Sequence, residues 1–162
     1  MGSVFNLEEV FDIAINIEKN GAQFYKLAAE KFDDSKSKDV FMGLAKMEEN
    51  HIRIFSELKK VFFADSQYFN DSFDDAGLYL KEFTSGCVFD LSIDFDSFFS
   101  DVVSVRDILK KAIGFEKDSI VFFTGIQKLV PDNLGKDKIS EIIDQEMDHV
   151  GQLGRQIAME DA

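Results

Sequence analysis

An internal repeat limits the possible folds of this chain more than any other feature of its sequence. Residues 14–25 (AINIEKNGAQFY) resemble residues 112–123 (AIGFEKDSIVFF), and residues 48–52 (EENHI) resemble residues 146–150 (EMDHV). Each copy carries one glutamate in its first segment and a Glu-x-x-His sequence in its second. The sequence therefore predicts two related halves with the same polar residues at matching places.

The repeated polar residues lie within apolar stripes that have helical spacing. Apolar side chains recur every three to four positions, so we expect helices over residues 6–32, 37–63, 104–130 and 136–159. A single proline in 162 residues also favours long helices. Where an ordinary core would have leucine, the four stripes contain, in chain order, Glu18, then Glu48 with His51, then Glu116, then Glu146 with His149.

The spacing of the repeated glutamates predicts their height in each pair of helices. In both copies the two glutamates are 30 residues apart, with a turn signal midway: the polar stretch 33–37 in the first and Pro131 in the second. A helix rises about 1.5 Å per residue, so equal lengths out and back return the chain to one level. We therefore expect the glutamates of each helical hairpin to face each other.

Residues 64–103 are predicted to join the two hairpins. This segment is acidic and rich in phenylalanine, and a connection along the length of a bundle can need such a crossover. We expect a short helix over residues 74–83 and an extended stretch over residues 88–95. The whole chain, residues 1–162, is thus predicted to be one all-α domain: an antiparallel four-helix bundle of two hairpins joined by a long crossover.

Composition and charge exclude several classes of function. The net charge of −13 repels phosphate backbones, so we expect no nucleic-acid partner. No apolar stretch is long enough to cross a bilayer, and no segment has the pattern of a signal peptide. Cys87 is the single cysteine and cannot form an internal disulfide. We therefore expect a cytoplasmic protein, with no membrane partner and a reduced thiol.

Buried carboxylates at one level of a bundle need cations to balance their negative charge. Ionised carboxylates in an apolar core are costly unless they are paired or bound to metal, and two divalent ions would neutralise four of them. The two histidines would add neutral imidazole ligands. This mixture of oxygen and nitrogen suits iron or manganese better than zinc or calcium, and both metals stay open.

The repeated segments, residues 14–25, 47–51, 112–123 and 145–149, resemble the rubrerythrin-like branch of the ferritin-like superfamily. Bundles of that superfamily bind two metal ions through one Glu from each of two helices and Glu-x-x-His from the other two. The resemblance covers the four helices, roughly two thirds of the chain. It implies two iron ions and a homodimer. It also implies that Glu48 and Glu146 bridge the metals, that Glu18 and Glu116 are terminal ligands or shift between binding modes, and that His51 and His149 each bind one metal.

Two departures from the family bear on the expected reaction. Rubrerythrins usually carry a further Glu one turn after the third-helix ligand, where this chain has Ser119, which puts a peroxidase cycle with a moving iron in doubt. The four-cysteine rubredoxin module is absent from the sequence. We therefore expect electrons from a separate donor or from Fe²⁺ itself.

Three functions remain open at this point. The first is a non-haem di-iron oxidase or peroxidase acting on O₂ or H₂O₂, and the second is a ferroxidase or iron-storage protein. The third is a metal-free helical interaction protein. Tyr25 is the candidate catalytic residue, because it lies two turns after Glu18 and could bond a ligand carboxylate or supply an electron. Core packing with a bonded hydroxyl is the equally weighted alternative, and Phe123 holds the repeat-related place.

Overall fold

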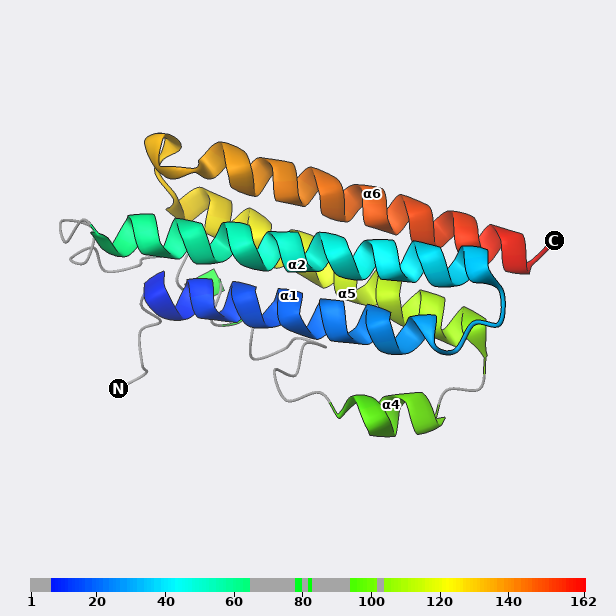
Figure 1. Ribbon diagram of the computed structural model, residues 1–162. Helices are drawn as coiled ribbons and strands as arrows, with labels where there is room; N and C mark the ends of the chain where they lie inside the picture. The colour runs from blue at the N-terminus through cyan, green and yellow to red at the C-terminus, as the bar shows by residue number, and fades with distance from the viewer. Residues whose placement is uncertain (1–6, 65–77, 80–81, 83–93, 102–103) are drawn as a thin grey trace.

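Four long helices form a bundle in the computed structural model, which describes residues 7–64, 78–79, 82, 94–101 and 104–162. They are α1 (Leu7–Ala29), α2 (Ser35–Ala64), α5 (Val105–Leu129) and α6 (Lys136–Glu160). A short helix, α4 (Phe95–Asp101), precedes α5, and a 3₁₀ turn, η2 (Asp132–Leu134), precedes α6. The predicted all-α four-helix bundle is confirmed (Figure 1).

The helices pack as two hairpins with every packed pair antiparallel. Helix α1 packs on α2 and α5 packs on α6, while further contacts join α1 to α5 and α2 to α6. In Figure 1, α1 and α6 run in one direction and α2 and α5 in the other. Because α2 ends at the opposite end of the bundle from the start of α5, the intervening chain must cross the bundle's length.

The turn between α1 and α2 begins and ends at other residues than the sequence predicts. Helix α1 ends at Ala29, and residues 30–32 continue it only through tighter three-residue turns. Helix α2 begins at Ser35, two residues before its predicted start, because Asp34 caps it: the backbone N–H of Ser37 donates to Asp34 Oδ1 at 2.7 Å. Hydrogen bonds from Ser37, chiefly from its backbone N–H, hold the pKa of Asp34 below its usual value.

Aromatic side chains fill the core on both sides of the bundle's middle. Towards one end Phe11 and Phe123 each pack against Phe55, with ring centroids 6.5 and 4.8 Å away. Towards the other end Phe41 packs against Tyr25 at 5.9 Å. All of these rings are buried. The middle of the bundle is therefore closed off from water along its axis by apolar layers.

Helix α4 is a described part of the crossover and packs against α1. Its Phe98 and Phe99 lie with ring centroids 5.6 and 5.3 Å from that of Phe24 on α1. Of the helix predicted over residues 74–83, residues 78, 79 and 82 are described, and they are helical. Residues 88–93 and Cys87 lie outside the described residues, and Phe95, predicted to be extended, instead begins α4.

Within the described residues, no helix combines the length and apolar character needed to span a membrane.

Gly135 is expected to be sensitive to substitution. It joins η2 to α6 with a φ of 100°, and an added Cβ would lie 2.2 Å from Leu58 Cδ2. Gly135→Ala should therefore lower the free energy of unfolding by about 1–3 kcal/mol, measured by urea denaturation. Gly154→Ala is the matched control: it lies inside α6 with open space around it and should stabilise the protein by about 0.5–1 kcal/mol. Equal effects of the two variants would contradict this account.

Candidate metal centre

The six predicted ligand residues meet in the middle of the bundle. None of them is more than 3% exposed. All four long helices contribute, since the set consists of Glu18 on α1, Glu48 and His51 on α2, Glu116 on α5, and Glu146 and His149 on α6. In each Glu-x-x-His sequence the two side chains lie three positions apart and so share one helical face.

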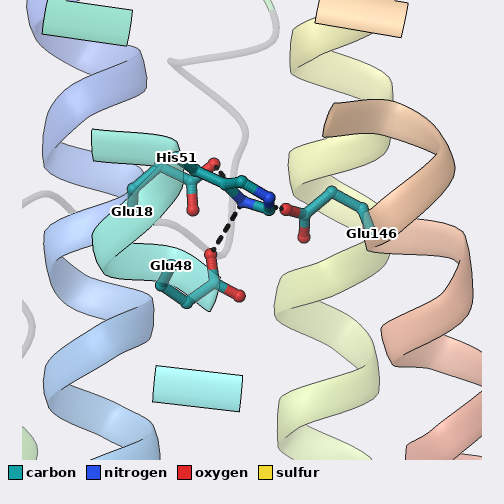
Figure 2. Close-up of side chains that lie close together, drawn as sticks. All are labelled: Glu18, Glu48, His51 and Glu146. Atoms are coloured by element: carbon teal, nitrogen blue, oxygen red, sulfur yellow. Dashed lines mark ion pairs between the residues drawn. The ribbon is translucent and has the colours of Figure 1, made fainter. Parts of the chain in front are cut away.

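The six residues form two overlapping groups that could each hold a metal ion. One group is Glu18, Glu48, His51 and Glu146, and in the other Glu116 and His149 join the same Glu48 and Glu146. Within each group the four candidate ligand atoms all lie within 4.8 Å of one another. Figure 2 shows the first group, with Glu146 reaching from the second hairpin towards the three residues of the first.

Glu48 and Glu146 each offer one carboxylate oxygen to each histidine. The Nδ1 atom of His51 lies 3.5 Å from Glu48 Oε2 and 2.8 Å from Glu146 Oε1. The Nδ1 atom of His149 lies 3.3 Å from Glu48 Oε1 and 3.7 Å from Glu146 Oε2. This is the arrangement that a carboxylate needs to bridge two ions.

Glu18 and Glu116 stand at the outer sides of the two groups. Glu18 Oε1 lies 3.6 Å from His51 Nδ1, and Glu116 Oε1 lies 3.4 Å from His149 Nδ1. The two imidazole rings are nearly parallel, with centroids 5.9 Å apart. The site thus repeats in space the two-fold pattern that the sequence repeats along the chain.

Burial and mutual charge divide the four carboxyl groups into two kinds. Burial, and then the neighbouring carboxylates, raise the pKa of Glu18 and of Glu116 well above the usual value. Burial also opposes ionisation of Glu48 and Glu146, but the surrounding acids and imidazoles outweigh it and lower the pKa of both. Without cations, two carboxylates and two protonated acids can therefore coexist here.

The histidines complete this balance. Burial by itself would lower the pKa of His51 and His149, but the three carboxyl groups around each ring outweigh it and raise both pKa values. Two imidazolium ions then offset two carboxylates, so the metal-free cluster can be neutral. Cations would take the place of these protons.

Unpaired polar atoms show that the cluster fits bound cations. Six of its buried atoms make no hydrogen bond: Glu18 Oε1, both side-chain oxygens of Glu146, Nδ1 of His51, and Nδ1 and Nε2 of His149. Buried polar atoms are normally hydrogen-bonded, and each unpaired one costs stability. Five of the six can donate a lone pair towards the space between the histidines, which is what a metal ion requires.

Tyr25 contacts the cluster through one carboxylate. Its buried hydroxyl donates a hydrogen bond to Glu116 Oε1, from α1 across to α5. Burial, and then the charge of Glu116, raise the pKa of Tyr25 well above its usual value. Its repeat-related counterpart Phe123 has no hydroxyl. The Tyr25 hydroxyl therefore bonds a candidate ligand, which both interpretations of this residue, catalytic and core packing, allow.

Two residues at the cluster were not identified from the sequence. Gly21 leaves room for Glu48, since a Cβ at Gly21 would lie 3.4 Å from Glu48 Cγ; a glycine within a helical stripe was the available signal. Gln145 lies 2.7 Å from His51 through its Oε1 atom, and no sequence signal marked it. Ser119 donates to its own helix at Phe115 O, 3.0 Å away.

Comparisons with known proteins agree with this geometry. Residues 6–82 match the family model described as Rubrerythrin. The fold matches a solved structure from Thermotoga maritima, described as that of a provisionally assigned ferritin-like diiron-carboxylate protein, over 98% of both chains with a TM-score of 0.77 and 21% identity. No curated protein matches the chain. The predicted resemblance to rubrerythrin-like, ferritin-like proteins is confirmed.

Proposed function

We propose that this rubrerythrin-like, ferritin-like chain holds two iron ions between its four helices and acts as a non-haem di-iron oxidase or peroxidase on O₂ or H₂O₂. One observation carries the proposal: Glu48 and Glu146 each direct one oxygen to His51 and the other to His149. A metal-free interaction protein gives no reason for six unpaired polar atoms in its core.

Each ion would have one imidazole and several carboxylate oxygens. Glu18 and His51 would hold the first ion, Glu116 and His149 the second, and Glu48 and Glu146 both. Manganese accepts the same ligands, and ferritin-like bundles with this single-imidazole, oxygen-rich set hold either metal. Iron is the metal that we propose here. We also propose a homodimer that receives electrons from a separate donor protein.

The bound iron would supply two electrons together to an O–O bond. In a peroxidase reaction, H₂O₂, two protons and two electrons give two molecules of water, and the donor protein restores the electrons. The chain's own part is to keep water away from the ligands with the rings of Phe55, Phe41 and Phe123. Tyr25 holds a proton at Oη beside Glu116 and is placed to give it up during the reduction.

Ferroxidase activity is the second candidate, and Ser119 favours it. The Ser119 hydroxyl bonds its own helix, so this position offers no additional carboxylate to hold an iron that moves during a peroxidase cycle. The same six ligands would then bind Fe²⁺ as a substrate and oxidise it. Storage of the product would require a hollow multi-subunit shell, which a sizing column distinguishes from a dimer.

The two reactions are separated by rapid mixing. The anaerobic protein, loaded with two Fe²⁺ ions per chain, is mixed with H₂O₂ or with O₂ and followed by absorbance. Faster oxidation by H₂O₂, with repeated turnover when a reductant is present, is expected for the peroxidase. Faster oxidation by O₂ with retention of Fe³⁺ supports the ferroxidase. Loaded protein that reacts with neither oxidant would contradict both.

Tyr25→Phe tests the role of the hydroxyl. The variant removes the hydrogen bond to Glu116 but none of the six ligands, so it should still bind two ions per chain. The rate of oxidation by H₂O₂ should fall about 10²-fold if this group delivers the proton. Tyr79→Phe, at an exposed tyrosine of the crossover, is the control and should react like the wild type. Wild-type rates in Tyr25→Phe would reduce its role to packing.

A further inference from the structure

The imidazole of His51 lies between two consecutive residues of α6. Its Nε2 atom lies 2.7 Å from Gln145 Oε1, and its Nδ1 atom lies 2.8 Å from Glu146 Oε1. An amide oxygen can only accept, so the N–H of this pair is on Nε2. The lone pair of the neutral ring is then on Nδ1, which faces the other carboxylates of the first group.

The other histidine has no such support. Met47 precedes Glu48 as Gln145 precedes Glu146, so it holds the repeat-related place, and a thioether is at most a weak acceptor. The Nε2 atom of His149 is buried and makes no hydrogen bond. Nothing comparable therefore fixes which nitrogen of His149 carries the proton.

The hydrogen bond from Tyr25 adds to the same asymmetry independently. It goes to Glu116, in the group of His149, and draws negative charge away from that carboxylate. On the other side Phe123 holds the related place, and Glu18 Oε1 makes no hydrogen bond. The first group thus has a fixed imidazole and an outer carboxylate, Glu18, with an oxygen that makes no hydrogen bond. In the second group the imidazole is not fixed, and the outer carboxylate, Glu116, shares an oxygen with Tyr25.

We propose that Gln145 is a positioning residue that makes the His51 position the tighter of the two metal positions, so that ions fill the protein in a fixed order. The first ion enters beside Glu18 and His51, and the second beside Glu116 and His149. Partners that orient a ligating histidine change metal affinity by about 10–100-fold when they are removed. This inference rests on the proposed function, since it requires both groups to bind metal.

Titration with Co²⁺ tests the order of filling without any redox reaction. The metal-free protein is titrated anaerobically and followed by visible absorbance and by calorimetry. The wild type should bind two ions in steps whose affinities differ by about 10–100-fold. Gln145→Met removes the support of His51 and leaves the Tyr25 hydrogen bond in place, so the tighter step should weaken by that factor and approach the other. Met47→Gln supplies an acceptor for Nε2 of His149 and should strengthen the weaker step.

Further variants separate positioning from a general structural effect. Gln145→Glu keeps the acceptor and should restore the tight step, and His51→Ala should remove the tight step alone. The metal-free Tm of Gln145→Met should fall by only the few degrees that one lost buried hydrogen bond costs. Two steps of equal affinity in the wild type, or unchanged binding in Gln145→Met, would overturn this inference alone. Failure of the wild type to bind Co²⁺ would overturn the proposed function as well.

Discussion

Alanine in place of Glu146 is expected to abolish the binding of both metal ions. Glu146 belongs to both ligand groups, with Oε1 near His51 and Oε2 near His149. Its removal would take one charged ligand from each ion, and only Glu48 would remain as a ligand common to both groups. The metal content after extensive dialysis, measured by elemental analysis, should fall from two ions per chain to none.

Two comparison variants show whether Glu146→Ala loses both ions because Glu146 bridges them. Glu18→Ala removes a ligand that belongs to one group only, so this variant should lose one ion and keep the other. Glu141→Ala, at an exposed residue of the same helix as Glu146, should keep both ions. If Glu146→Ala retained the wild-type metal content, or lost no more metal than Glu18→Ala, Glu146 would not be a bridging ligand.

Removal of metal is expected to lower the melting temperature by about 8–16 °C for each of the two ions. An ion that binds only the folded state, present at about 1,000 times its Kd, stabilises the protein by about 4 kcal/mol. In a domain of this size, each kcal/mol corresponds to about 2–4 °C. The metal-free protein should nevertheless stay folded, because protons can take the place of cations: the raised pKa values of His51 and His149 and the lowered pKa values of Glu48 and Glu146 allow a neutral cluster.

Thermal unfolding followed by circular dichroism measures this effect. The wild type is compared before and after treatment with a chelator, and again after Fe²⁺ or Mn²⁺ is restored, which should recover the original Tm. Glu146→Ala serves as the control, because a protein that holds no metal should not respond to the chelator. A wild-type Tm that is indifferent to both treatments would favour the metal-free interaction protein.

The position of the site was predictable because helix geometry is regular. Equal spacing from each glutamate to a turn signal was enough to place Glu18 opposite Glu48 and Glu116 opposite Glu146, since the rise per residue is constant. The apolar stripes then predicted that these residues face inward, and all of them are buried. Periodicity therefore predicted both the bundle and the residues that meet inside it.

Contacts between helices were not predictable in the same way. Gln145 bonds a histidine on another helix, and nothing in its own surroundings in the sequence indicates that. Which carboxylate Tyr25 would bond was equally open, because four lie at the same height. The early start of α2 follows from its capping by Asp34, a local interaction that periodicity does not describe. Residues 64–103 have too weak a period to predict α4.

Anomalous X-ray diffraction at the iron absorption edge, from crystals of the aerobically purified protein, tests the central claim most directly. We expect two anomalous peaks between the carboxylates of Glu48 and Glu146, one beside Nδ1 of His51 and the other beside Nδ1 of His149. Crystals of the wild-type protein that show no peak between the four helices, or peaks only at acidic residues on the surface, would contradict it.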